Sequence, residues 1–494
     1  MQSNSMNIWQ KSLAYMAPSF GVVLLSAPLA VLGGIYAKHY GLSLSTIGTV
    51  MLCARLFDAI TDPLVGYYSD HQRVKIGTRK PLMLIGAAAL VPCSYFLFVP
   101  PKDVDIAYFM FWYMAFYLAM TTYNIPHLAW ANEFTKTSEE KTLVFSIMGI
   151  VGSVGSALFY LLPLLPFFVT TEVTPAVLKV SVYLGIALLI PGIFFALKLV
   201  PNGPPHNTLS IPEKGLGSTL RQKIKALLLA LYKNKPFILF LLTIMCSGIG
   251  FGMWVGLFFI YVDTFLHLGA EFAGLSMWGM VMGALAIPIW YRLAILWGKR
   301  PTWLVGMTLF IIVFFGTGLL EPEPGGFYKL FALNMLMTFA SGSAGVVAAP
   351  MLCDVIDYGR LKDGVERSAV YFAINGILVK VQAAMGGALG FILVGLFGFD
   401  MKATEQMPLA ITGLRLSVAW VPMFFMVIAM FLIARMPLTE ARMKVVRRRL
   451  GLRDNRLQHA ASELINLESL GTHANNESSI DYLQQNPKPS RTRA

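Results

Sequence analysis

The chain has 494 residues, of which 56% are hydrophobic and only 13% are charged. Soluble domains carry about 25% charged residues, so this composition excludes an ordinary water-soluble enzyme and predicts a membrane protein. The net charge is +13. Because Lys and Arg are concentrated in loops and the tail between apolar stretches, we interpret the charge as a topology signal and exclude nucleic acid as a partner.

Apolar windows bounded by Gly, Pro and charged residues predict twelve membrane-spanning helices, since each needs about 20 apolar residues. The predicted spans are 13–37, 43–68, 82–99, 106–131, 143–168, 176–200, 237–266, 270–296, 302–320, 328–357, 367–398 and 409–435. The expected fold class is an all-α membrane protein with two six-helix bundles.

A polar, Lys-rich linker between the sixth and seventh spans divides the chain into parts. The expected parts are an N-terminal bundle, 1–200, a cytoplasmic linker, 201–236, a C-terminal bundle, 237–435, and a tail, 436–494. The Arg-rich stretch from 441 to 457 is either a helix on anionic lipid headgroups or a topology signal without a further role. Beyond Glu468 the tail is polar and poor in aromatic residues, so we expect it to be disordered.

Positive charge predicts the orientation of the chain in the membrane. The loop 71–80, the linker and the start of the tail are basic, whereas the loops at 100 and at 321 are poor in Lys and Arg. Both termini are therefore expected in the cytoplasm, with the spans in the inner (plasma) membrane. A short repeat, GTRKP from Gly77 and GKRP from Gly298, follows the second span of each half and indicates two related halves, with a substrate bound between them.

Charged residues in the second span are the strongest functional signal. A charge at the centre of the bilayer costs about 2.5 to 3.5 kcal/mol on insertion scales, yet this span holds Arg55, Asp58 and Asp62. Spacings of three and four place them on one helical face, beside Thr61. Two carboxylates one turn apart repel each other, so one is protonated or a cation binds between them. The alternative is a structural ion pair between Arg55 and Asp58.

The identity of the cation is left open by these residues. For Na⁺, the oxygens of Asp58, Asp62, Thr61 and Thr121 supply hard ligands. For H⁺, one carboxylate suffices, with Arg55 or Lys380 holding the other ionised.

Further polar residues within the spans are candidates for a substrate cavity. Lys380 lies about thirteen residues into the eleventh span, where a lysine must face a cavity or a carboxylate. The candidate cavity residues are Arg55, Asn124, His127, Trp130, Lys380, Tyr371 and Asn375.

Charged loops after the second and tenth spans suggest a cytoplasmic gate. Acids at the end of the tenth span lie at an unfavourable helix C-terminus, so bases of facing loops are the expected partners. The candidate gate residues are Asp70, Arg79, Lys80, Asp354, Asp357 and Arg367.

The segment RLFDAITDPLVG at 55–66 resembles the second-helix signature of the glycoside-pentoside-hexuronide:cation symporters, the melibiose-permease-like branch of the major facilitator superfamily. Similar matches are GTRKP at 77–81, NIP at 124–126, DVIDYG at 354–359 and the position of Lys380. The resemblance extends from about residue 10 to 435. It implies that Asp58 and Asp62 bind the coupling cation with Thr121, beside Lys380.

Some positions depart from the family's galactoside carriers. The acids that those proteins carry in the first and fourth helices are replaced by Val22, or a neighbour, and by Asn124, and the segment 143–156 lacks their arginine. Melibiose is therefore not the expected substrate. Thr61 replaces the Asn of many Na⁺-coupled members, which leaves Na⁺ and H⁺ open.

The expected function is a monomeric symporter, coupled to Na⁺ or H⁺, that imports a glycoside, oligosaccharide or hexuronide by alternating access. It needs no cofactor beyond the coupling ion, and its partners are the small-molecule substrate and the lipid bilayer. The alternatives are a carrier of lysophospholipid or another amphiphile and a non-transporting membrane sensor. An enzyme is not expected, because no nucleophile–base pair and no metal-ligand cluster is visible in the sequence.

Overall fold

The computed structural model describes residues 7–135, 138–202, 234–363, 368–401, 403, 406–453 and 455, and within them the regular structure is all helical. The helices of the first half are α1 (Ile8–Ser26), α2 (Leu29–Ile35), η1 (Tyr36–Tyr40), α3 (Leu44–Ile76), α4 (Lys80–Phe98), α5 (Ile106–Phe134), α6 (Ser138–Leu161), η2 (Leu162–Leu164) and α7 (Pro175–Leu199). Those of the second half are α9 (Lys235–Ile260), η3 (Tyr261–Phe265), α10 (Phe272–Trp297), α11 (Lys299–Leu319), α12 (Gly326–Asp363), α13 (Ser368–Leu396), α14 (Pro408–Arg415), η4 (Leu416–Trp420) and α15 (Val421–Ala434).

Eleven stretches of the described chain are helices long and apolar enough to cross a membrane. They coincide with eleven of the twelve predicted spans. The remaining span, predicted at 106–131, is α5, a helix of 29 residues that is not apolar enough to be counted among the eleven. At 1.5 Å per residue α5 is about 43 Å long, enough to cross a hydrocarbon core of about 30 Å.

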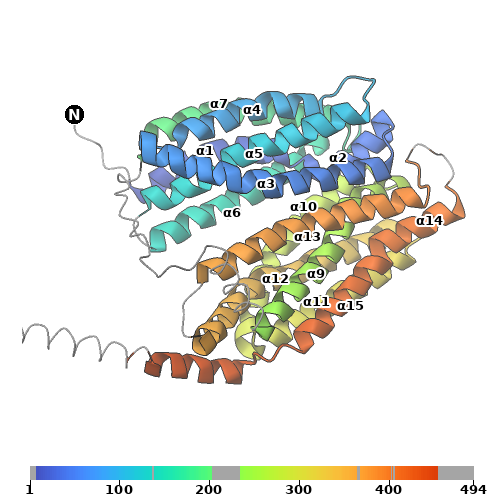
Figure 1. The fold of residues 1–494 in the computed structure, drawn as a ribbon. Coiled ribbons are helices and arrows are strands. Elements are labelled where there is room, and N and C mark those ends of the chain that lie inside the picture. The colour runs from blue at the N-terminus through green and yellow to red at the C-terminus, as the bar shows by residue number, and fades with distance from the viewer. Residues whose placement is uncertain are drawn as a thin grey trace, which may run out of the picture.

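The helices form two bundles, one from each half of the sequence (Figure 1). In the first, α1 packs on α7 and α4 on α5, and in the second, α9 packs on α13 and α10 on α12. The bundles meet mainly where α3 lies against α13 and α6 against α10. Their ribbons are closest at the end that holds α2 and α14 and diverge toward the opposite end (Figure 1). The basic loops predict that the diverging end is cytoplasmic, and we call the other one the outer end.

The short repeat falls at the turn after the second span of each half, and in both turns its glycine has a positive φ, although the ψ angles differ, with 1° at Gly77 and 161° at Gly298. Gly77 ends α3 with a φ of 79°, and Gly298 separates α10 from α11 with a φ of 87°. Residues with a Cβ rarely adopt such angles. The conformation required at these turns therefore explains the two glycines at equivalent places.

The first span of each half ends in a five-residue π-helix, η1 or η3. The first residue of each, Tyr36 or Tyr261, donates its hydroxyl proton to a backbone oxygen near the end of α4 or α11, at 2.6 Å in both cases. This equivalence extends the internal repeat from sequence to tertiary contacts.

The outer ends of the halves are packed closely together. A Cβ on Gly34 of α2 would lie 2.3 Å from the ring of Phe259 of α9, so only glycine permits this approach. A Cβ on Gly395 of α13 would lie 2.5 Å from the backbone nitrogen of Ser45. The structure is therefore closed at its outer end.

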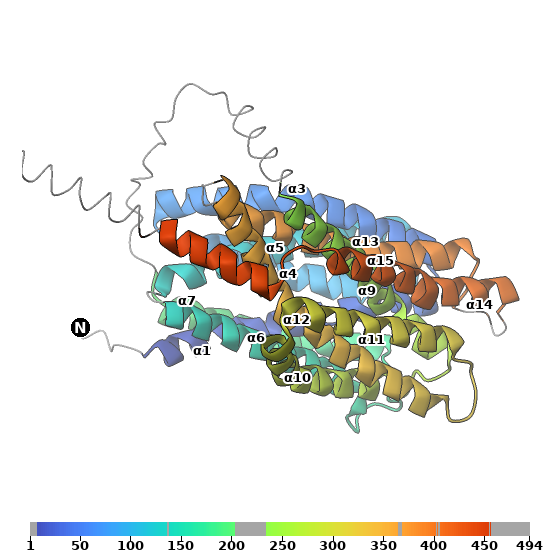
Figure 2. The same cartoon turned by 90° about the horizontal axis from the view of Figure 1, so that it is seen from below.

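Residues 440–453 of the tail form a helix beside the cytoplasmic end of α12 (Figure 2). Met443, Val446 and Leu450 are buried at spacings of three and four, whereas the basic residues are exposed. A helix is therefore present at the start of the tail, but its apolar face packs on the protein. The remainder of the tail, 456–494, and most of the linker, 203–233, lie outside the described residues.

Candidate functional site

The predicted cation site lies around Asp62, where three helices meet. Asp62 is on α3, and one of its oxygens accepts a hydrogen bond of 2.9 Å from the Thr121 hydroxyl of α5. The other forms an ion pair with the ammonium group of Lys380 on α13. The structure thus brings together three predicted residues, and the pair of Asp62 and Lys380 joins the two halves.

Asp58 lies one turn before Asp62 on α3, as its spacing predicts. One of its oxygens is 3.7 Å from Arg55 Nη1, an ion pair too long for a hydrogen bond. The other, Oδ1, is buried and has no hydrogen-bond partner in the described part of the chain. Buried acceptors are normally satisfied, so this oxygen is available to a proton or a metal ion. The Thr61 hydroxyl is turned toward its own helix and donates to the backbone oxygen of Asp58 at 3.4 Å.

These acids line a cavity of 640 Å³ between α3 and α13. Its charged residues are Arg55, Asp58, Asp62 and Lys380, and most of the remaining wall is apolar. Two acids and two bases balance one another. The described residues hold no group of three or more His, Cys, Asp or Glu that could hold a metal ion.

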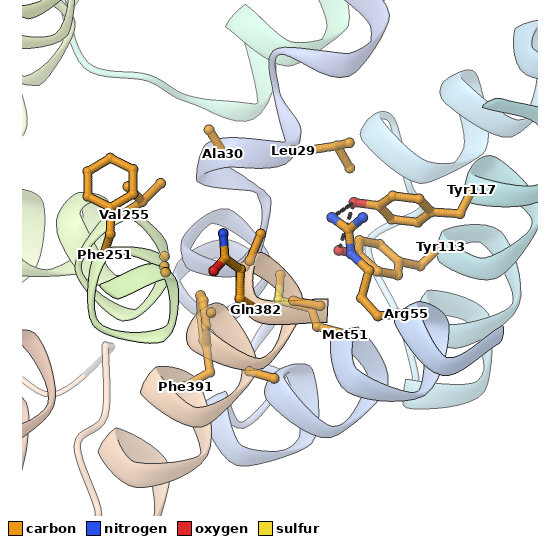
Figure 3. Close-up of a pocket in the computed structure, with 18 residues that line it drawn as sticks. Leu29, Ala30, Met51, Arg55, Tyr113, Tyr117, Phe251, Val255, Gln382 and Phe391 are labelled. Atoms are coloured by element: carbon orange, nitrogen blue, oxygen red, sulfur yellow. Dashed lines mark hydrogen bonds between the residues drawn. The ribbon is translucent and has the colours of Figure 1, made fainter. Parts of the chain in front are cut away.

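A second cavity, of 360 Å³, lies in the centre between the two halves (Figure 3). Arg55, Tyr113 and Tyr117 contribute its polar wall from the first half, and Gln382 of α13 lies opposite them (Figure 3). Arg55 lines both cavities and therefore connects the substrate-sized central space with the acids. The sequence did not single out the two tyrosines or Gln382 as cavity residues.

Two predicted cavity residues of α5 are instead packed inside the first bundle. The ring of His127 is buried between those of Tyr15 and Tyr123, with centroid distances of 4.1 and 5.1 Å, and Nε2 is 3.2 Å from the backbone oxygen of Tyr15. Trp130 is buried near the cytoplasmic end, where Nε1 donates to the backbone oxygen of Pro201 at 3.1 Å. Both were predicted at the cavity, and both instead hold helices together.

The other three predicted cavity residues are also absent from the linings of the two cavities. The buried Tyr371 hydroxyl accepts a hydrogen bond of 3.0 Å from Asn234 Nδ2, just before α9. Asn124 and Asn375 are half-buried on α5 and α13, on faces that do not line either cavity. None of the three therefore lines either cavity in this structure, and Tyr371 bonds Asn234 instead.

The predicted gate residues of the first half form a network within that half. Arg79 donates to Glu133 and pairs with Asp70, both at 2.6 Å, and Lys80 donates to the backbone oxygens of Leu197 and Val200. Burial lowers the pKa of Arg79, but the hydrogen bonds to Glu133 and Asp70 outweigh it and leave this pKa raised. Arg79 stays charged, and the network stabilises the cytoplasmic ends of α3, α4 and α5.

The acids of the second half also find partners in their own half. Asp354 pairs with Lys299 of α11 and, at 2.6 Å, with Arg447 of the tail helix, which is 4.0 Å from Asp357. We expected bases of facing loops as the partners of these acids, and the observed partners are Lys299, next to the turn between α10 and α11, and Arg447 of the tail helix. The role of these residues in a gate stays a prediction. Arg367, the last predicted gate residue, lies outside the described residues.

An ion pair between the halves closes the outer end instead, and we call it the outer latch. Lys38 Nζ donates to both oxygens of Asp263 at 2.8 Å, and the Asp263 side chain is 3% exposed. Lys38 and Asp263 are the third residues of η1 and η3, so they occupy equivalent positions of the repeat. These two residues were not identified from the sequence. Asp263 lies within the predicted span 237–266, and a carboxylate inside an apolar span is energetically costly, so its position was a signal that could have identified it.

Comparison with known proteins agrees with this architecture. The MFS/sugar transport protein family model matches residues 14–440, and the chain belongs to this family. The protein is therefore a multi-pass inner-membrane protein of the transporter class and not an enzyme.

Several curated relatives cover most of the chain. An uncharacterized symporter YnaJ of Bacillus subtilis is 24% identical over 90% of this chain and 95% of its own length. A glucuronide carrier protein homolog of Escherichia coli is 23% identical over 83% of this chain and 88% of its own length. An isoprimeverose transporter of Lactiplantibacillus pentosus is 24% identical over 84% of this chain and 85% of its own length.

Solved transporter structures share the fold. The nucleoside transporter NupG gives a TM-score of 0.61 at 14% identity, covering 87% of this chain and 99% of that one. The xylose transporter XylE of Escherichia coli, in an inward open conformation, gives a TM-score of 0.57 at 16% identity, covering 90% of this chain and 99% of that one.

Proposed function

We propose that the protein is a cation-coupled symporter that imports a glycoside, oligosaccharide or hexuronide by alternating access. The observation that carries the proposal is the group of Asp58, Asp62 and Lys380 at the contact between the halves, next to a central cavity. Relatives named as a glucuronide carrier homolog, an isoprimeverose transporter and a putative glycoside/cation symporter support the substrate class and the coupling.

We infer that Lys380 occupies the position of the coupling ion beside Asp62 while no ion is bound. Its ammonium group neutralises Asp62 in the same way that Na⁺ or H⁺ would, so the ion and the ammonium group compete for one carboxylate. Lys380 is 64% exposed and has a flexible stem, and it can leave Asp62 when the ion arrives. Asp58, with its unpartnered oxygen, and the Thr121 hydroxyl complete a set of oxygen ligands.

Ion binding then acts on the contact between the halves. Displacing Lys380 breaks the ion pair that joins α3 to α13, so ion occupancy changes the relative stability of the inward-facing and outward-facing arrangements. Without a coupling ion, the pair between Asp62 and Lys380 holds α3 against α13, and separating the two helices would leave an uncompensated charge in a largely apolar region, which disfavours crossing in that state. This is the physical basis of coupling.

A transport assay tests the proposal directly. Cells that express the full chain are given labelled glycosides, uronides and a lysolipid, in Na⁺ and in Na⁺-free buffer at two pH values, beside an Asp62→Asn variant. We expect sugar uptake that requires Na⁺ or a proton gradient and is lost in the variant. Sugar uptake that is independent of both ions, or unchanged in Asp62→Asn, contradicts the coupling role of this site.

A carrier of amphiphiles is the second candidate, and one observation favours it. The cavity of 640 Å³ between α3 and α13 has an apolar wall that includes Leu56 and Ile377, both strongly exposed. An acyl chain fits such a wall better than a sugar does. In the same assay, lysolipid flux without sugar uptake would favour this candidate. The choice of ion and the monomeric state stay predictions.

A further inference from the structure

A third cavity lies at the outer end, on the side where α6 packs against α10 (Figure 2). It has a volume of 550 Å³, and we call it the outer groove. Leu164 and Thr171, from the segment that follows α6, form its wall in the first half, and the beginnings of α10 and α12 form its wall in the second half. It shares no lining residue with the central cavity or with the cavity around Asp62. Neither the coupling ion nor a substrate in the central cavity therefore explains it.

Aromatic side chains form much of the wall of the outer groove. They are Trp278 of α10 and Phe327, Tyr328 and Phe331 of α12. Trp278 is 54% exposed and Tyr328 is 76% exposed. The ring centroid of Phe327 is 5.5 Å from that of Tyr328 and 5.9 Å from that of Phe331. The faces of such rings attract cations, and groups of them bind organic ammonium ions.

A carboxylate lies beside these rings. Among the described residues that line the outer groove, Glu271 is the one with a formal charge. It immediately precedes α10, yet its side chain does not cap that helix and makes no hydrogen bond or ion pair with the described part of the chain. A metal ion would need several more oxygen ligands, and Thr171 supplies the one further aliphatic hydroxyl of the lining. One carboxylate beside aromatic rings is instead complementary to an organic ammonium group.

The outer groove continues into a surface of α10 that faces the bilayer. Trp278 begins a stripe that includes Val281, Leu285 and Ile289, which are 44%, 59% and 47% exposed. Spacings of three and four place these side chains on one face of the helix. Because α10 is long and apolar enough to cross a membrane, this exposed apolar face contacts acyl chains.

The segment after α6 is a second, independent sign of lipid at this place. Phe167 is 79% exposed and Val169 is fully exposed, and both lie between Leu164 and Thr171 of the groove wall. Exposed apolar side chains in such a patch indicate contact with a membrane or another protein. At the outer end of a span, beside an apolar stripe, the surface available to them is the outer leaflet.

We propose that the outer groove binds a phospholipid of the outer leaflet whose headgroup carries an ammonium group, as phosphatidylethanolamine does. The ammonium group lies against the aromatic rings and pairs with Glu271, and the acyl chains follow the stripe of α10 from Val281 onward. The Thr171 hydroxyl is a donor for a phosphate oxygen. This lipid is a bound component of the membrane and not the transported substrate, so the inference goes beyond the proposed function.

Lipid binding to the purified full chain tests the inference. The protein is stripped of lipid in a mild detergent and titrated with dioleoyl phosphatidylethanolamine or dioleoyl phosphatidylglycerol, and native mass spectrometry measures the bound lipid. The two lipids share their acyl chains and phosphate and differ in an ammonium group against a glycerol. The variants are Glu271→Gln, Trp278→Leu and Gly274→Leu. The controls are Asp103→Asn, an exposed acid in another outer loop, and Trp297→Leu, an exposed tryptophan at the other end of α10.

We expect the wild type to bind phosphatidylethanolamine at least about 10-fold more tightly than phosphatidylglycerol. Glu271→Gln should weaken binding of phosphatidylethanolamine about 10-fold and Trp278→Leu about 5-fold, with little change for phosphatidylglycerol. Both control variants should bind like the wild type.

Gly274→Leu separates an occupied groove from a damaged fold. Gly274 lines the outer groove, and a Cβ there would meet nothing within 4 Å. Leucine also favours a helix more than glycine does, so this variant fills the groove without destabilising α10, and thermal unfolding checks that it is folded. Its binding of phosphatidylethanolamine should fall to the level of phosphatidylglycerol.

Three results overturn the inference. The first is equal binding of the two lipids by the wild type, or an equal loss of both in Glu271→Gln. The second is unchanged binding of phosphatidylethanolamine in Gly274→Leu. The third is displacement of the lipid by an equal concentration of soluble glycerophosphoethanolamine, because the ligand would then be a free ammonium compound and not a bilayer lipid. None of these results bears on sugar uptake, so the proposed function is tested separately.

Discussion

Removing the outer latch should shift the protein toward an outward-open state. The perturbation is Asp263→Asn, which keeps the shape of the side chain and removes its charge. Because Lys38 and Asp263 meet only while the outer end is closed, their hydrogen bonds stabilise the closed state and not the open one. The same reasoning predicts that exchanging the charges, in Lys38→Asp with Asp263→Lys, restores closure in part.

The magnitude follows from the burial of the pair. The Asp263 side chain is 3% exposed, whereas that of Lys38 is 30% exposed, so the pair is worth more than a surface salt bridge and less than a fully buried one. Hydrogen bonds to charged groups contribute about 1.5 to 3 kcal/mol, which shifts the ratio of open to closed molecules about 10- to 150-fold. Glu172 is a matched control, because it is 3.7 Å from Lys38 and 41% exposed. Glu172→Gln should shift the ratio less than about 5-fold.

The assay is a distance measurement between spin labels in the outer loops of the two halves. Asp103 and Pro322 are exposed there and can carry the labels in a variant without the four native cysteines. We expect a population with a longer distance in Asp263→Asn and little change in Glu172→Gln. An unchanged distance distribution in Asp263→Asn, with the charge exchange also without effect, would refute the latch.

Two further variants test the cation site and the repeated turn. Thr121→Val removes the hydroxyl that donates to Asp62 and should raise the cation concentration for half-maximal uptake about 10-fold. The control is Thr122→Val, which removes a hydroxyl that bonds its own helix and should leave this concentration unchanged. Equal effects of the two variants in uptake assays would argue against Thr121 as a ligand. Gly298→Ala should destabilise the protein by about 1 to 3 kcal/mol in thermal unfolding, because its φ is 87° and its new Cβ would lie 2.8 Å from a side-chain carbon. Gly149→Ala, in a helix with open space around it, should be neutral or stabilising, and a similar loss in both would contradict the argument from backbone conformation.

Hydropathy predicts spans well but not the ends of helices. The predicted span 43–68 corresponds to α3, which continues to Ile76 and ends at Gly77. The predicted span 328–357 corresponds to α12, whose described residues continue to Asp363. A hydropathy window ends where charged residues begin, whereas the backbone hydrogen bonds continue into water until a turn residue stops the helix.

The acids of α3 could be predicted because their pattern is local. Arg55, Asp58 and Asp62 lie on one helix, so spacing alone places them on one face. His127 shows the limit of this reasoning. Its place in a span suggested a cavity, but the rings of Tyr15 and Tyr123 enclose it, and contacts between distant helices are not visible in spacing. The outer latch was missed for the same reason, since its residues are 225 positions apart.

The most direct test of the central claim measures ion movement driven by sugar. The full chain is reconstituted into liposomes with equal ion concentrations on both sides, and a gradient of transported sugar is applied while radioactive Na⁺ or internal pH is followed. We predict that inward sugar movement carries Na⁺ or H⁺ into the liposomes although no ion gradient is applied. Asp58→Asn should abolish this ion movement. Inward sugar flux with neither Na⁺ nor H⁺ moving would contradict the claim that the acids of α3 couple an ion to the sugar.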